Sequence, residues 1–252
     1  MLNSYGSFCD DFFQDMYVHT ELELPKERET ILYFFERIQK QYPSMCSFNF
    51  RDNNDYILKS DSSRGEYRWI CLEVDRIGSG VVNPRNLETG YQQHRLVLDV
   101  IPYLLHVNHL DIRSVDLTFS MDFDCSGSHD EIISEALFGS SAFNSLFKLP
   151  SARPVGLAPF VAVALTPDGR TQARVSVESK SSGYIDRRKE EPDEGAISLS
   201  FTIRQYPGGE EKFDSLKSFE RQCRTAEQIM DEKIIPNFVQ PLNETISQKR
   251  LM

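Results

Sequence analysis

Cysteine is scarce in this chain, and its arrangement excludes two classes of small protein. Five cysteines are spread between positions 9 and 223 of the 252 residues, and no two of them form a C-x-x-C pair. An odd, widely spaced set of this kind supports neither a disulfide scaffold nor a zinc ribbon. A buried thiol serves instead as a small apolar side chain. We therefore expect a protein of a reducing compartment, the cytoplasm.

Long hydrophobic runs are also missing. The apolar stretches are far too short to span a bilayer, which takes about 20 residues in a helix. The first 16 residues contain three aspartates and no basic residue, whereas a secretory signal peptide begins with a basic segment. The sequence therefore predicts neither a signal peptide nor a membrane partner.

Basic residues are fewer than acidic residues in this chain. The chain has 28 lysines and arginines against 38 acidic residues, which gives a formal net charge of −10 at pH 7. An acidic body repels the phosphate backbone of nucleic acids. No cluster of basic residues is interleaved with aromatic residues, so we expect no nucleic-acid partner.

Catalytic motifs are absent as well. The chain has no G-x-S-x-G elbow and no Walker A sequence. Gly78-Ser79-Gly80 begins like a dinucleotide fingerprint, but Asn83 stands where the third glycine should be. Cys125 is close to His129 in sequence, yet the neighbouring acids disfavour a reactive thiolate. His94 lies on the apolar face of a predicted helix and is expected to be a hydrogen-bonded core residue. The sequence predicts no catalytic residue and no organic cofactor.

What the chain does contain is strands with one apolar face. The clearest runs from Asp111 to Asp124, and its apolar positions are Val115, Leu117, Phe119, Met121 and Phe123. Alternation with a period of two puts these side chains on one face and the polar ones on the other. The pattern is typical of an antiparallel or mixed sheet that is buried on one side. We expect helices on the apolar face and an open, polar opposite face.

One order of predicted elements occurs twice along the chain. A strand at 16–24, after an irregular lead-in at 1–14, precedes a helix at 25–42. Several strands follow, of which the one at 67–77 is expected to be central, and then a loop at 78–84 and a helix at 87–105. A strand at 111–124 then precedes a helix at 128–137, which begins with a capping pattern formed by Ser128 and Glu131. Three strands follow, with a loop at 179–195 between the last two, and then a long helix at 216–246 that Pro236 should bend. This order predicts an α+β fold with about seven mostly antiparallel strands, four helices on one face and a tandem strand-helix-strands-helix pseudo-repeat. We expect two halves, 1–109 and 110–252, that share one sheet and one core.

Four residues near the end of the 111–124 strand are candidate metal ligands: Asp122, Asp124, His129 and Asp130. The sequence D-x-D-x-S-G, with alternating oxygen donors followed by glycine, resembles the opening of a calcium loop. An EF-hand needs glutamate at the twelfth position, which is Ile133 here. A different site for calcium or magnesium stays open, and with it the alternative function of a metal-dependent hydrolase.

Polar residues on the strands form a second candidate site. Arg174, Arg204, Glu178 and Asp116 all lie in strand patterns with polar neighbours. Such residues form cross-strand ion pairs or line a ligand-binding groove. Our leading interpretation is a non-enzymatic protein that binds a small molecule or another protein through the polar sheet face or the cleft between the halves. Homodimer formation through a strand edge at Phe160–Leu165 is a further hypothesis.

Three short features occur in a recognisable order. Tyr42-Pro43 follows the first helix, Arg68-Trp69 lies in a central strand, and Asp116 lies in the mid-chain strand. In this order and spacing, most of the chain resembles a sporadically distributed family of uncharacterised bacterial proteins of similar length. That family has no established activity, so the resemblance assigns no catalytic residue. It implies a bacterial cytosolic protein with an accessory role.

Overall fold

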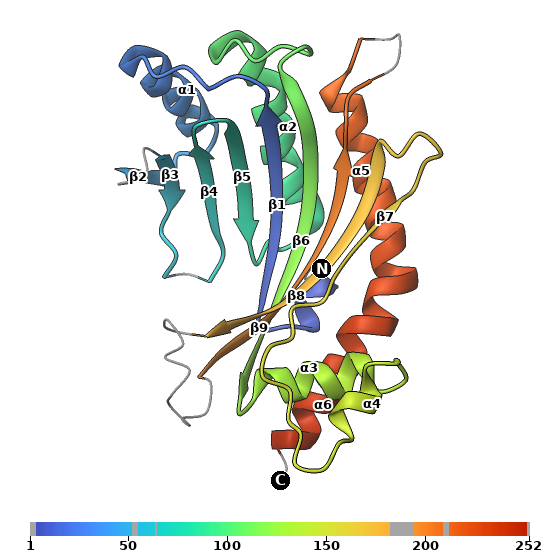
Figure 1. Cartoon of the computed structure of the whole chain (residues 1–252). Coiled ribbons are helices and arrows are strands. Elements are labelled where there is room, and N and C mark those ends of the chain that lie inside the picture. Colours follow the sequence, from blue (N-terminus) through green and yellow to red (C-terminus); the bar gives the residue numbers. More distant parts are fainter. Residues whose placement is uncertain (1–3, 52–54, 64, 182–193, 209–211, 251–252) are drawn as a thin grey trace.

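Nine antiparallel strands form one sheet in the order β2-β3-β4-β5-β1-β6-β9-β8-β7 (Figure 1). The computed structural model describes residues 4–51, 55–63, 65–181, 194–208 and 212–250. The strands are β1 (Asp11–Thr20), β2 (Met45–Phe50), β3 (Tyr56–Ser60), β4 (Tyr67–Leu72), β5 (Arg76–Val82), β6 (Ile112–Ser126), β7 (Phe160–Ala164), β8 (Thr171–Ser181) and β9 (Glu194–Gln205). The predicted α+β fold with an antiparallel sheet is confirmed, with more strands than the seven expected.

The helices pack on one face of this sheet and leave the other face uncovered (Figure 1). They are η1 (Tyr5–Ser7), α1 (Arg28–Gln41), α2 (Leu87–Leu104), α3 (His129–Phe138), α4 (Asn144–Phe147), α5 (Ser215–Ile229), η2 (Met230–Val239) and α6 (Gln240–Arg250). None of the helices in the described ranges is long and apolar enough to cross a bilayer. We call the side of the sheet that lacks helices the uncovered face.

The central strands β1 and β6 show why the sheet has two different faces. Met16 pairs with Leu117, and Phe119 pairs with Phe201 of β9, all facing the helices. Phe119 and Phe201 are each only 1% exposed. Their sequence neighbours, such as Thr118, turn to the uncovered face, because successive strand residues point to opposite sides. The predicted burial of this apolar stripe is confirmed.

The first strand begins earlier than its sequence pattern indicates. β1 starts at Asp11, within a segment expected to be an irregular lead-in, and ends at Thr20. Phe12 and Met16 are fully buried, which extends the alternation toward the N-terminus, whereas Leu22 is 68% exposed beyond the strand. Asp11 and Asp15, the acidic residues within β1, alternate with these buried side chains and lie on the uncovered face.

A second difference concerns the segment expected to be one strand from Tyr67 to Ile77. It is a hairpin of β4 and β5, in which Trp69 pairs with Gly80. Glu73 N–H donates to the carbonyl of Arg76 at 2.9 Å, and the two side chains form an ion pair across the turn. The glycines expected to form a loop therefore lie within a strand.

The C-terminal helical segment is continuous but not uniform. α5 passes into the π-helix η2, which contains Pro236, and then into α6. Proline lacks the N–H that an α-helix would use and its ring collides with the preceding turn. The wider i→i+5 spacing of a π-helix is a common way to absorb such a disruption, where a simple bend was expected.

Both predicted halves contribute to one sheet and to one cluster of buried apolar side chains. Outward from β1 the strands are β5, β4, β3 and β2, and outward from β6 they are β9, β8 and β7. This order is compatible with a pseudo-repeat, which stays a prediction. The loop expected at 179–195 lies mostly outside the described residues.

Candidate functional site

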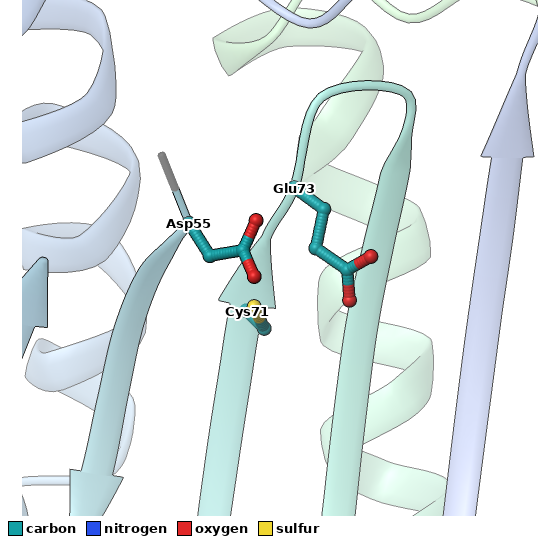
Figure 2. A group of neighbouring side chains, drawn as sticks. All are labelled: Asp55, Cys71 and Glu73. Carbon is teal, nitrogen blue, oxygen red and sulfur yellow. The ribbon is translucent and has the colours of Figure 1, made fainter. Parts of the chain in front are cut away.

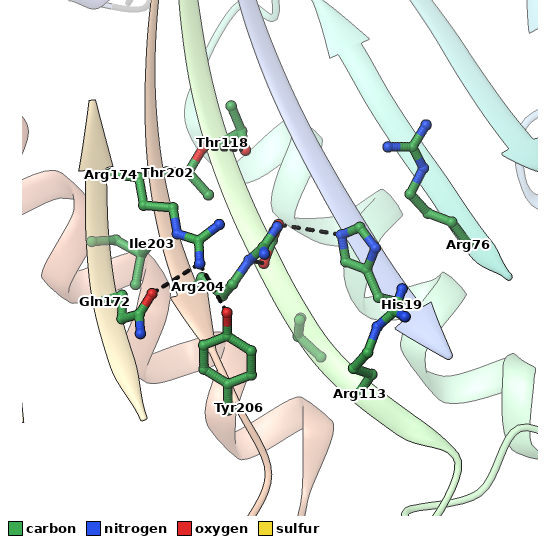
Figure 3. A network of polar contacts seen from close by, with 12 residues as sticks. His19, Arg76, Arg113, Thr118, Gln172, Arg174, Thr202, Ile203, Arg204 and Tyr206 are labelled. Atoms are coloured by element: carbon green, nitrogen blue, oxygen red, sulfur yellow. Dashed lines mark hydrogen bonds and ion pairs between the residues drawn. The ribbon is translucent and has the colours of Figure 1, made fainter. Parts of the chain in front are cut away.

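An ion pair with a buried carboxylate lies on the uncovered face, at paired positions of β6 and β9. Arg204 donates from Nε to Asp116 Oδ1 at 2.7 Å and from Nη2 to Oδ2 of the same carboxylate. His19 Nε2 of β1 is 3.3 Å from Asp116 Oδ2 (Figure 3). Burial alone would raise the pKa of Asp116, but the hydrogen bonds from His19 and Arg204 outweigh it and lower the pKa. Asp116 is therefore a fixed anion whose charge is already compensated.

Arg174 lies beside this pair on β8 and has a different environment. Its Nη2 donates to Gln172 Oε1 and to the hydroxyl of Tyr206, each at 2.8 Å (Figure 3). Its Nε is buried and has no hydrogen-bond partner within the described ranges. No carboxylate among the described residues forms an ion pair with Arg174. We call His19, Asp116, Arg174, Arg204 and Tyr206 the polar cluster.

Tyr206 responds to the positive charge of the polar cluster. Burial, the largest single effect, raises its pKa, but the hydrogen bonds and charges of Arg204 and Arg174 together outweigh burial and lower the pKa of Tyr206. The ring of Tyr206 also lies 6.0 Å from the guanidinium of Arg204. The direction of this shift is the one expected for a hydroxyl beside two guanidinium groups, those of Arg174 and Arg204.

Two further arginines near the cluster are already neutralised. Arg76 forms two hydrogen bonds with the carboxylate of Glu73, at 2.8 and 2.7 Å. Arg113 pairs with Asp75 at 3.3 Å. Arg76 and Arg113 are both labelled in Figure 3. Among the described residues, Arg174 therefore differs from each of these basic neighbours in having only neutral partners.

Aromatic side chains continue the uncovered face next to the polar cluster. Tyr17 of β1 stands opposite Asp116, and its ring centroid is 6.1 Å from that of Trp69. The guanidinium of Arg76 lies 5.0 Å above the Tyr17 ring. This face thus combines a charged region with an aromatic one, and the sequence did not reveal their proximity.

Glu178, the fourth predicted ligand-binding residue, does not join the polar cluster. It is exposed and stands opposite Ser198, whereas Arg174 stands opposite Thr202. Four residues of strand separate Glu178 from Arg174, which is about 13 Å at 3.3 Å per residue. The structure brings together Asp116, Arg204 and Arg174 only.

The four predicted metal ligands occupy separate environments. His129 is buried and lies 2.7 Å from Ser179 Oγ and 3.4 Å from the carbonyl oxygen of Cys125. Asp130 accepts a hydrogen bond from the Leu157 N–H at 2.7 Å. Among the described residues, none of the four candidates belongs to a group of ligand atoms close enough together to hold one metal ion. The four candidates are Asp122, Asp124, His129 and Asp130.

Asp122 and Asp124 lie instead among the acids at the start of β1. Asp122 stands opposite Asp11, and the Asp124 N–H donates to Asp10 Oδ2 at 2.7 Å. Slight burial and then the charges of Asp10, Asp11 and Asp122 raise the pKa of Asp124. The charge of Arg250 lowers the pKa of Asp124, but it does not offset the repulsion from the neighbouring carboxylates.

One group does meet the distance requirement for a metal site. Ligand atoms of Asp55, Cys71 and Glu73 lie within 4.8 Å of one another (Figure 2). Burial, followed by the charges of Glu73 and Asp55, raises the pKa of Cys71 to about 12, so the thiol stays protonated. The carboxylate of Glu73 is occupied by Arg76. A metal ion bound here would have to displace Arg76 from Glu73 and deprotonate the Cys71 thiol, so we assign no metal to this group.

His94 has the environment that its position on α2 predicted. It is fully buried, and its Nδ1 lies 2.9 Å from Ser79 Oγ. Burial lowers its pKa to about 3, so the ring is neutral. The interpretation of His94 as a hydrogen-bonded core residue is confirmed.

Two depressions occur on the helical side of the molecule. One, of about 400 Å³, is lined by α3, α4 and the end of α6, including Glu131 and Lys249. The other, of about 540 Å³, lies between α1 and α2 and includes Tyr33 and Tyr103. Each is built from one predicted half alone, so neither corresponds to a cleft between the halves.

Comparisons with known proteins give little guidance. No family model and no curated protein matches the chain. A solved structure, the di-domain ARO/CYC StfQ from the steffimycin biosynthetic pathway, is similar over 94% of this chain and 99% of that chain, at 8% identity and a TM-score of 0.24. A TM-score at this level assigns neither fold nor function, so the candidate site has to be interpreted from its own geometry.

Proposed function

We propose that this chain is a non-enzymatic binding protein that recognises a carboxylate-bearing ligand or protein segment on its uncovered face, through Arg174. The observation that carries the proposal is the charge balance of the polar cluster. Arg204 is neutralised by Asp116, whereas the hydrogen bonds of Arg174 go only to neutral groups in the described part of the chain.

The chemistry of arginine supports an anionic ligand. A guanidinium offers five N–H donors in a planar fork that matches a carboxylate. Arg174 uses only Nη2, and its Nη1 forms no hydrogen bond within the described residues. A hydrogen bond between charged groups contributes about 1.5–3 kcal/mol. A carboxylate would therefore gain more binding free energy at Arg174 than at Arg204, whose charge Asp116 already compensates.

The surroundings of Arg174 favour rigid recognition. Gln172 of β8 and Tyr206, which directly follows β9, both accept hydrogen bonds from Nη2 of Arg174. A side chain fixed before binding loses less conformational entropy when the ligand arrives. The aromatic pair Tyr17 and Trp69 on the same face offers apolar contacts for the rest of a ligand.

A titration with a hexaglutamate peptide tests this proposal. We expect the Arg174→Gln variant to bind the peptide at least roughly tenfold more weakly than the unmodified chain, as about 1.4 kcal/mol corresponds to a factor of ten. Arg113→Gln is the matched control, because Arg113 is a nearby arginine that already pairs with Asp75. Equal affinity in both variants, or no binding by the unmodified chain, would contradict the proposal.

The alternative of a metal-dependent hydrolase has weaker support. His129 and Asp130 bond to other groups, and Asp122 and Asp124 lie within an acidic cluster. A calcium, magnesium or manganese ion bound there would raise the unfolding temperature by mass action, and Asp122→Ala with Asp124→Ala would remove the rise. An unchanged unfolding temperature with all three ions rejects the hydrolase.

A further inference from the structure

The strand β7 is an unprotected edge of the sheet. It is the last strand in the order and pairs only with β8. All of its residues are exposed, including Phe160 at 63%, Val161 at 57% and Val163 at 49%. The two valines face the helical side, next to Ala173 and Val175, but no helix in the described ranges covers them. β7 is therefore apolar and accessible on both faces.

The backbone of β7 also has open hydrogen-bonding positions. The carbonyl of Pro159 accepts from Val177, and the Leu165 N–H donates to Thr171, so odd-numbered residues bond to β8. Successive residues of a strand direct their backbone N–H and C=O groups to opposite sides. Phe160, Ala162 and Ala164 therefore direct their N–H and C=O groups away from β8, and they form no backbone hydrogen bond on that side within the described residues.

The charge pattern points to the identity of the partner. Residues 154–167 contain no charged side chain, in a chain with a net charge of −10. Proteins usually protect an exposed edge with lysine, an internal proline or a bulge, and β7 has none of these. A strand without charged side chains offers no electrostatic attraction to an acidic or a basic partner. It also adds no charge repulsion when two copies of an acidic protein approach each other at this edge.

We propose that β7 pairs antiparallel with β7 of a second copy of this chain, about a two-fold axis at Ala162. In this register Phe160 faces Ala164 of the second copy, Val161 faces its Val163, and Ala162 faces its own equivalent. Each large side chain is then opposite a smaller or equal one. The open backbone groups of both strands form six hydrogen bonds, because each copy supplies three N–H and three C=O groups.

The interface extends the existing architecture. Pairing of Val161 with Val163 of the second copy continues the apolar face of β8 and β9 across the axis. The symmetry is closed, since the same patch is used on both copies, so the assembly stops at a dimer. The sheet becomes continuous through both chains.

The oligomeric state measured by light scattering after size exclusion tests this inference. We expect a mass of about twice 29.0 kDa for the unmodified chain. Ala162→Pro removes an N–H that points away from β8, and Val163→Lys places a charge in the interface; both should give the single-chain mass. Leu22→Lys introduces the same charge at a distant exposed leucine and should stay dimeric.

Circular dichroism and the unfolding temperature verify that each variant is folded. A single-chain mass for the unmodified protein at its highest soluble concentration overturns the inference. A dimer that persists in both folded β7 variants also overturns it, because the contact then lies elsewhere. Loss of the dimer in Leu22→Lys as well would show a general effect of charge and would equally overturn it.

Discussion

Gly80 lies in the middle of β5, under the ring of Trp69. A Cβ atom at this position would lie 2.2 Å from Trp69 Nε1 and 2.3 Å from Asp15 Oδ1. Glycine in a strand is otherwise unfavourable, and close packing against another group is a common reason for it. The sequence presented Gly78 and Gly80 as a loop, because the side chain that needs their space comes from a neighbouring strand.

We expect Gly80→Ala to destabilise the fold. Overpacking of this kind costs about 1–3 kcal/mol, because the indole ring has to leave its position. Gly156→Ala is the control, since no atom lies within 4 Å of the Cβ it would add. Urea unfolding of both variants measures the difference, and equal stability would show that the ring moves without cost.

His94 makes stability depend on pH in a predictable direction. Its pKa is lowered from 6.5 to about 3, so the unfolded chain takes up a proton at a higher pH than the folded chain does. The contribution of His94 to the free energy of unfolding is therefore fully present above pH 6.5, and it is lost progressively as the pH decreases toward about 3. His94→Asn keeps a hydrogen-bonding group near Ser79 but does not titrate.

The measurement is the slope of unfolding free energy against pH between 4 and 6.5. We expect this slope to be smaller in His94→Asn than in the unmodified chain. His106→Asn is the control, because His106 is exposed and has a positive φ of 58° that asparagine tolerates. If both variants have the slope of the unmodified chain, the buried ring is not the source of the acid sensitivity.

At the level of elements, capping residues fix where the helices begin. Asn86 Oδ1 accepts from the N–H of Thr89 at 2.9 Å and from its hydroxyl at 3.0 Å, at the start of α2. Asn86→Ala removes both bonds and should cost about 1 kcal/mol. Thr89→Ala removes only the second and should cost less. Thermal unfolding of the two variants checks this order, and the reverse order would contradict the assignment of Asn86 as the cap.

Strand pairs were harder to predict than helices. The turn between β4 and β5 contains no glycine or proline and is closed by the ion pair of Glu73 with Arg76. The residues on either side of this turn are apolar on both faces of the sheet. The sequence pattern therefore does not indicate where β4 ends and β5 begins. The capping pattern at Ser128, in contrast, is local, and Ser128 Oγ does accept from the Glu131 N–H at 3.3 Å.

On the scale of the whole molecule, alternation in the sequence was sufficient to predict a sheet with one apolar and one polar face. It was not sufficient to predict which strands are neighbours. Asp116 and Arg204 could be expected to form a cross-strand pair, but the position of Arg174 beside Tyr206 depends on the order of β8 and β9 in the sheet. The proposed site therefore follows from the sheet order rather than from any motif.

The central claim is that Arg174 receives an anion, and the side-chain Nε–H signals of the arginines in an NMR spectrum test it most directly. During titration with hexaglutamate, we predict that the Arg174 signal shifts and that the signal of Arg204, fixed by Asp116, changes less. An Arg174 signal that stays in place while the peptide binds would contradict the account.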